Sequence, residues 1–137
     1  MENVFTHTAY SSYLNDHRLM GSKDLQTGEV FLPPRPMNPE TFSTTMEWVE
    51  LKGEGTLQAF TIVYIAPTAM IEAGYDRKNP YCVGIVKLEE GPMMSGLILG
   101  VDVRNPASIQ IGMPLKVSFV DRGEGEGKQT FLAFEPA

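Results

Sequence analysis

Residues 22–42 read SKDLQTGEVFLPPRPMNPETF and separate a short helical pattern from a long strand-rich region. At their centre stands Phe31-Leu32-Pro33-Pro34-Arg35-Pro36. Proline fixes φ and lacks an amide donor, so this centre cannot form a helix interior or a central strand. An extended, polyproline-like conformation is the natural alternative. The flanking residues are polar and turn-forming, and none of them is a cysteine.

The composition is that of an ordinary globular protein. A chain of 137 residues fits one domain with a small appendage and can bury a core without disulfides. The net charge of −6 argues against nucleic acid as a partner. Cys82 is the only cysteine, so we expect a reducing, cytoplasmic location. No apolar run is long enough to span a membrane, and the first ten residues lack the layout of a signal peptide.

The N-terminal stretch, residues 1–21, is predicted to contain a helix over 8–20. One apolar and aromatic stripe recurs at helical spacing. The helix either packs on the core of this chain or docks on a partner subunit. Thr8 is its expected N-cap and Gly21 its expected end, and the stripe consists of Tyr10, Tyr13, Leu14, His17 and Met20.

From residue 46 onward the pattern predicts β-strands. The short helical turn of 105–112 lies between the third and fourth strands, which is the order of a five-stranded OB-fold barrel. A meander sandwich would show similar periodicity. Gly53-Glu54-Gly55 indicates a bend or bulge, or more weakly a phosphate loop, and 123–127 an acidic hairpin loop. The predicted strands are 46–51 with 56–65 as one long bent strand, then 81–89, 94–103, 115–119 and 129–135.

The connection 66–80 is unusually long, and long loops are often functional. It contains Met70 and Ile71, which a solvated loop does not need. These two side chains either tuck under the domain or face a partner.

Catalytic groups are scarce in this sequence. Both histidines, His7 and His17, lie near the N-terminus, so a catalytic triad would require one of them to reach the barrel. Cys82 fits a buried core residue, and Glu89 with Glu90 fits a solvated turn. We therefore expect no catalytic site and no cysteine-histidine metal site.

Binding is better supported than catalysis. Four aromatic residues, Trp48, Phe60, Tyr64 and Tyr81, would stack on planar rings if they lined one barrel face. This supports an alternative function as an OB module for single-stranded nucleic acid or oligosaccharide. Arg35 forms a positive cluster with Arg18 and Lys23. Held between prolines, its guanidinium would meet a phosphate at low entropic cost. A solvated surface arginine is the alternative.

The string from Gly28 to Pro39 resembles the zinc ribbon of the acyl-CoA-associated OB-fold family, once called domain of unknown function thirty-five. That ribbon runs Cys-x-x-Cys-Gly, an aromatic, Pro-Pro-Arg, then Cys-Pro-x-Cys. Gly28, Pro33-Pro34-Arg35 and Pro39 match it. Further landmarks follow in family order: Gly53-x-Gly55, Phe60-Thr61, Asn79-Pro80-Tyr81, Leu88-Glu89-Glu90-Gly91-Pro92 and Ile111-Gly112-Met113. The four cysteine positions fall on Asp24, Thr27, Asn38 and Thr41.

The resemblance implies a non-catalytic accessory subunit of a thiolase-like or ketoacyl-CoA enzyme, in a hetero-oligomer that handles CoA or acyl-CoA. It places a degenerate ribbon at 22–45, without zinc, and an OB barrel at 46–137. The CoA or partner site would comprise Phe31, Pro33, Pro34 and Arg35, with Arg18, Lys23 and Tyr81. Arg35→Ala should then weaken CoA binding more than Lys128→Ala. A thioesterase using Cys82 or Glu89 is a third alternative.

Overall fold

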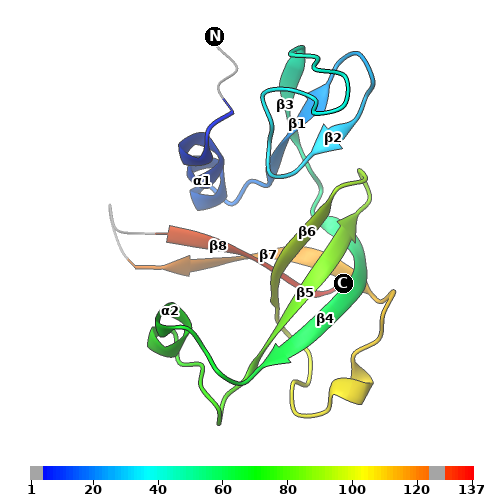
Figure 1. Cartoon of the computed structure of the whole chain (residues 1–137). Helices are drawn as coiled ribbons and strands as arrows, with labels where there is room; N and C mark the ends of the chain where they lie inside the picture. Colours follow the sequence, from blue (N-terminus) through cyan, green and yellow to red (C-terminus); the bar gives the residue numbers. More distant parts are fainter. Residues whose placement is uncertain (1–4, 124–128) are drawn as a thin grey trace.

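The computed structural model describes residues 5–123 and 129–137, which form a small sheet of order β2-β1-β3 and a closed barrel of order β4-β5-β6-β8-β7 (Figure 1). The small sheet and α1 lie at one end of the barrel, and α2 lies toward the other. The elements are α1 (His7–Asn15), β1 (Met20–Asp24), β2 (Val30–Phe31), β3 (Met46–Glu50), β4 (Glu54–Val63), α2 (Thr68–Glu72), β5 (Tyr81–Leu88), β6 (Met93–Ile98), the 3-10 helix η1 (Pro106–Ser108), β7 (Pro114–Arg122) and β8 (Gln129–Pro136).

Helix α1 is shorter than the sequence predicts. Thr6, rather than Thr8, is the N-cap, and its hydroxyl accepts a hydrogen bond from the Ala9 amide at 3.1 Å. The helix ends at Asn15, and His17 adopts the left-handed conformation with φ 58°. No glycine stands at this end of the helix. The apolar stripe continues to Met20, which is the first residue of β1, and the predicted helix is therefore too long.

The small sheet contains residues from all three of the predicted regions, the N-terminal stretch, the ribbon and the barrel. Strand β1 pairs antiparallel with both β2 and β3, so Ser22 lies opposite Phe31 on one side and Trp48 on the other. The predicted boundary at 21/22 therefore lies inside β1, and the one at 45/46 lies directly before β3. The predicted strand 46–51 belongs to the small sheet and is not the first barrel strand. The barrel instead begins at β4, after Gly53 turns the chain with φ 78°.

The prediction of a mainly β chain with a five-stranded OB barrel is confirmed, and closure of the sheet excludes the sandwich alternative. Strand β5 shows why the pattern was readable: Cys82, Val86 and Leu88 are buried, while Ile85 and Lys87 between them are exposed. The helical turn expected within 105–112 is the shorter η1, which begins at Pro106 and ends at Ser108. The predicted acidic loop falls, from residue 124 on, outside the described residues.

One apolar core joins the two sheets. Tyr10 and Leu14 of α1 belong to the same buried cluster as Leu57 and Phe134 of the barrel. Of the two alternatives for the N-terminal helix, packing on this chain's own core is therefore observed. Among the described residues, no helix has both the length and the apolar character needed to cross a membrane.

Candidate functional site

The ribbon segment, residues 22–45, contains two turns with the same internal hydrogen bonds. In the first, Gly28 donates its amide to the Asp24 carbonyl at 2.7 Å; in the second, Phe42 donates to the Asn38 carbonyl at 2.8 Å. Gly28 and Phe42 both have positive φ, 81° and 62°. The side chains of Asp24 and Asn38 also play the same part, each accepting a backbone amide two residues later at 2.9 Å. The turns are therefore two copies of one structure, fourteen residues apart.

The two turns meet through their first residues. Asp24 and Asn38 are 0% and 1% exposed, and the Asn38 Nδ2 donates to Asp24 Oδ2 at 2.8 Å. The Ser43 hydroxyl donates to Asp24 Oδ1 at 3.2 Å. The hydrogen bond from the Asn38 side-chain amide is the largest cause, and that from the Gln26 backbone amide the second largest, that lower the pKa of Asp24 from its ordinary value of 3.8. The carboxylate is thus the centre of a buried hydrogen-bonded core.

This core does not fit the structural zinc ion of the resembling family. Such sites use thiolate sulfurs and imidazole nitrogens in a tetrahedron. Here the four positions offer one carboxylate, one amide and two hydroxyls. Both Asp24 oxygens accept hydrogen bonds from the protein, and the Thr27 and Thr41 hydroxyls accept from backbone amides at 3.2 and 3.3 Å. Within residues 5–123 and 129–137, no three His, Cys, Asp or Glu side chains gather to hold a metal ion.

Four of the predicted binding residues lie together beside this core. Phe31 and Pro34 are half-buried, and Pro33 and Arg35 are exposed. Pro33 and Pro34 form one wall of a hollow of about 210 Å³ against the start of α1. The Arg35 amide donates to the Ser22 hydroxyl at 2.8 Å, which fixes the backbone there. Its guanidinium has no hydrogen bond or ion pair in the part of the chain that the structure describes.

The other three predicted residues are placed differently. The Arg18 guanidinium lies 2.8 Å from the Glu50 carboxylate and stacks over Tyr13, so its charge is largely balanced. Lys23 is exposed on β1. Tyr81 is buried as the first residue of β5, and its ring centroid lies 5.2 Å from that of Tyr75. Strand β5 begins at the end of the barrel away from the small sheet (Figure 1). The structure therefore does not bring Tyr81 to the ribbon.

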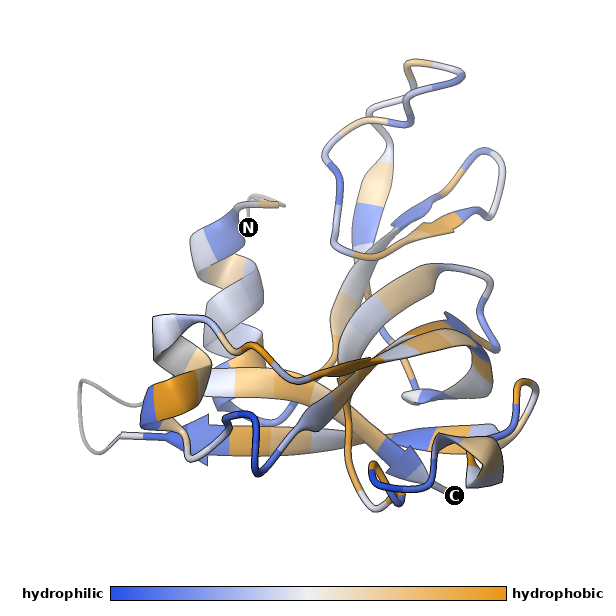
Figure 2. Cartoon of the chain, turned by 60° about the horizontal axis from the view of Figure 1, so that its bottom comes forward, coloured by the Kyte–Doolittle hydropathy of each residue, from blue (hydrophilic) through white to orange (hydrophobic). Residues whose placement is uncertain are grey.

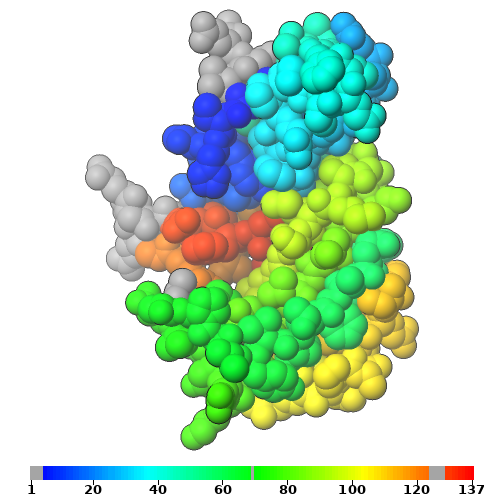
Figure 3. All heavy atoms as spheres, viewed as in Figure 1, coloured from blue at the N-terminus to red at the C-terminus, as the bar shows by residue number. Residues whose placement is uncertain are grey.

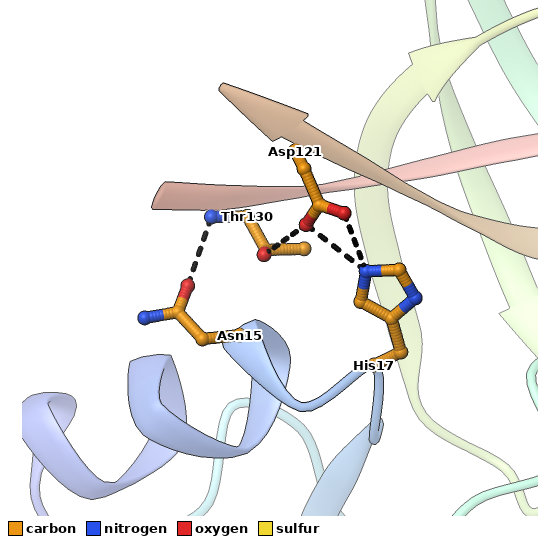
Figure 4. A network of polar contacts seen from close by, with 4 residues as sticks. All are labelled: Asn15, His17, Asp121 and Thr130. Atoms are coloured by element: carbon orange, nitrogen blue, oxygen red, sulfur yellow. Dashed lines mark hydrogen bonds and ion pairs between the residues drawn. The ribbon is translucent and has the colours of Figure 1, made fainter. Parts of the chain in front are cut away.

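A histidine does reach the barrel, as a triad would require. His17 Nε2 lies 2.8 Å from Asp121 Oδ2 (Figure 4), and its ring stacks on Phe119. The Thr130 hydroxyl also bonds Asp121 rather than His17, and its amide donates to Asn15. Burial raises the pKa of the Cys82 thiol to about 11, which suppresses its reactive thiolate form. The network joins α1 to β7 and β8 without presenting a nucleophile to the histidine.

The predicted aromatic face does not form. Trp48 belongs to the small sheet and packs against Phe5 and Tyr13, with ring centroids 4.8 and 5.0 Å away. A different region has no counterpart among the predicted site residues: the outer barrel face beside α2, where Arg122 lies over the Phe131 ring. These two residues are separated in the sequence and become neighbours only through the β7–β8 pairing.

Comparison with known proteins identifies relatives of this chain. The family model for the C-terminal OB-fold domain of ChsH2 matches residues 48–120. A DUF35 domain-containing scaffold protein of Methanocaldococcus jannaschii is 30% identical over 102 residues, covering 74% of this chain and 67% of that protein. The alpha subunit of a 3-oxo-4,17-pregnadiene-20-carboxyl-CoA hydratase of Mycobacterium tuberculosis is 33% identical over 97 residues, covering 71% of this chain and 28% of that one.

A solved structure supports the fold over the full length. The chain described as Ltp2-ChsH2(DUF35) aldolase superposes with a TM-score of 0.75 at 22% identity, covering 99% of this chain and 98% of that one. The ribbon and the barrel thus recur together in another protein.

Proposed function

Because this chain belongs to the DUF35 family, whose barrel is the OB-fold domain of the ChsH2 type, we propose that it is a cytoplasmic, non-catalytic accessory subunit. It binds a thiolase-like or ketoacyl-CoA enzyme and forms a hetero-oligomer with it. The observation that carries the proposal is the similarity to a scaffold protein over two thirds of that protein's length. His17 contacts Asp121 and Phe119, and burial raises the pKa of the Cys82 thiol, so both side chains have a structural part in this proposal.

The ribbon of this subunit is metal-free in our proposal. The Asp24–Asn38 core occupies the place where the resembling family holds zinc, and it satisfies its buried polar groups internally. No cofactor is needed to shape the segment. The chain then presents a folded ribbon to its partner under conditions that would strip a zinc site.

CoA or acyl-CoA is the expected ligand of the complex. Arg35 supports this, because its backbone is held by Ser22 while its guanidinium remains exposed and without an ion pair among the described residues. A pre-organised guanidinium binds phosphate at a low entropic cost. Phe31, Pro33 and Pro34 supply a rigid apolar surface beside it.

Affinity purification of the tagged native chain from its own cells tests the partner. We expect an acyl-CoA enzyme of the thiolase or ketoacyl class in stoichiometric amount. Recovery of the chain alone, or with no enzyme that handles CoA thioesters, would contradict the proposed function.

Calorimetric titration of the purified complex with CoA tests the ligand. Arg35→Ala should weaken binding about tenfold or more, as expected for loss of one charge-assisted contact. Arg77→Ala, an exposed arginine on the loop after α2, is the matched control and should bind as the wild type does. Lys128, the comparison expected from the sequence, lies outside the described residues. Equal effects of the two substitutions would remove Arg35 from the site.

A further inference from the structure

The outer face of the barrel is apolar where water would favour polar side chains. Along β5, residues 82, 84, 86 and 88 point inward, so Val83 and Ile85 point outward, and Ile85 is 42% exposed. Leu97 of β6 pairs with Val83, and Ser95 with Ile85. Phe131 of β8 is also exposed on the outer surface. In an antiparallel sheet with one face in water, the residues that point to the water are normally polar.

Helix α2 extends this face. Met70 is half-buried, so it is partly tucked against the domain, whereas Ile71 is 55% exposed and is not. The hydrophobic colour on α2 is visible in Figure 2, and the surface between α2 and β8 faces the viewer in Figure 3. Two hollows, of about 290 and 640 Å³, lie along it. Arg122 and Phe131 line both hollows and join them into one surface.

Arg122 is the charged centre of this surface. Its guanidinium lies 4.6 Å from the centre of the Phe131 ring, and the residue is half-buried. Within residues 5–123 and 129–137 the guanidinium makes no ion pair and no hydrogen bond. Glu72 also lines the larger hollow, but among the described residues it forms no ion pair with Arg122. A cation among apolar side chains is stabilised most by a carboxylate whose own neighbours are apolar, because the ion pair is then shielded from water.

From this we infer that the barrel face, comprising Val83, Ile85, Leu97, Arg122 and Phe131 with Met70 and Ile71, is the docking surface for the enzyme subunit. The occupant is an apolar segment of that subunit carrying an aspartate or glutamate opposite Arg122. The inference rests on the proposed function and names the surface and the chemistry of the partner.

Two features of the face favour an enzyme subunit over other occupants. The surface is broad and shallow, spans several strands, and combines an apolar centre with an aromatic residue and an arginine, as the centres of protein interfaces do. A small molecule would need a site that encloses most of its surface. A second copy of this chain would bring another net charge of −6 to the contact.

The test uses the complex recovered with the native chain and measures its dissociation constant by biolayer interferometry. Ile85→Asp and Arg122→Glu should each weaken binding by at least about tenfold, as residues at an interface centre do. Lys87→Asp is the matched control, because Lys87 is exposed on the same strand two residues from Ile85. It should change the constant by less than about twofold. Thermal unfolding of each variant shows that the barrel is intact.

Charge exchange then locates the contact on the partner. A photo-crosslinking amino acid at position 85 should label an apolar segment of the enzyme that contains an acidic residue. Replacing that acid by arginine should restore binding of Arg122→Glu. Unchanged affinity of both variants would overturn the docking surface while the proposed function stands. Failure of the wild-type chain to bind any enzyme would overturn both. A dimer of this chain that Ile85→Asp dissociates would assign the face to self-association and overturn the inference.

Discussion

In the barrel, the side chains with no exposed surface are apolar, among them Leu57, Val86 and Phe134, whereas in the ribbon they are Ser22 and Asp24. The barrel is large enough to stabilise itself by burial of apolar surface. The ribbon is not, since segments below roughly 40 residues normally need a metal or disulfides. We propose that in this chain a buried carboxylate with its hydrogen-bond donors takes that role. The difference predicts that the two regions respond to different perturbations.

Removing a side chain from the barrel core should have the largest effect. Phe134→Ala deletes a ring with no exposed surface and should cost roughly 3–5 kcal/mol of the free energy of unfolding, through lost burial and the cavity left behind. Urea unfolding measures this. Phe131→Ala, three residues away on the same strand, is the control and should cost much less. Similar costs would show that the barrel core is not where its stability lies.

Breaking the ribbon core should have a smaller, local effect. Asn38→Ala removes the amide that pairs with the buried Asp24 carboxylate and should cost roughly 1–3 kcal/mol. Hydrogen exchange should accelerate over 22–45 and stay unchanged in β5 and β7. Asn79→Ala, which removes an exposed amide donor to the Gly74 carbonyl, is the matched control. Uniform acceleration across both regions would contradict a local role for the Asp24–Asn38 hydrogen bonds.

Acid should loosen the ribbon before the barrel. The folded state holds the pKa of Asp24 below 3.8, so the carboxylate stabilises folding above the unfolded pKa. That contribution is lost as the pH falls below about 4 and through the lowered pKa. Amide exchange followed along an acid titration should show it. In Asn38→Ala the loss should be smaller and should be complete at a higher pH, because the largest cause of the lowered Asp24 pKa is gone. If the midpoint of this acid transition is the same in Asn38→Ala as in the wild type, Asp24 is not the group whose protonation loosens the ribbon.

The joint between the two regions should contribute least. His17→Gln removes the exposed contact with Asp121, and exposed ion pairs contribute roughly 0–1 kcal/mol. Chemical unfolding of the single and double variants with Asp121→Asn gives the coupling directly. A coupling as large as the cost of Asn38→Ala would make the joint a third stabilising region.

The sequence predicted the barrel well because its strands alternate around one closed core. It failed at His17, where a left-handed residue other than glycine ends α1, and at β3, because two-residue periodicity looks the same in either sheet. The ribbon did carry a signal that was overlooked: Asp24 and Thr27 recur as Asn38 and Thr41, fourteen residues later. The barrel face gave no such signal, since Arg122 and Val83 are joined only by the folded chain.

Hydrogen exchange over residues 22–45, measured before and after treatment with a zinc chelator, tests the central claim most directly. We predict the same protection in both samples, because the Asp24–Asn38 core holds the ribbon without metal. Loss of protection on chelation, with recovery on adding zinc, would contradict it.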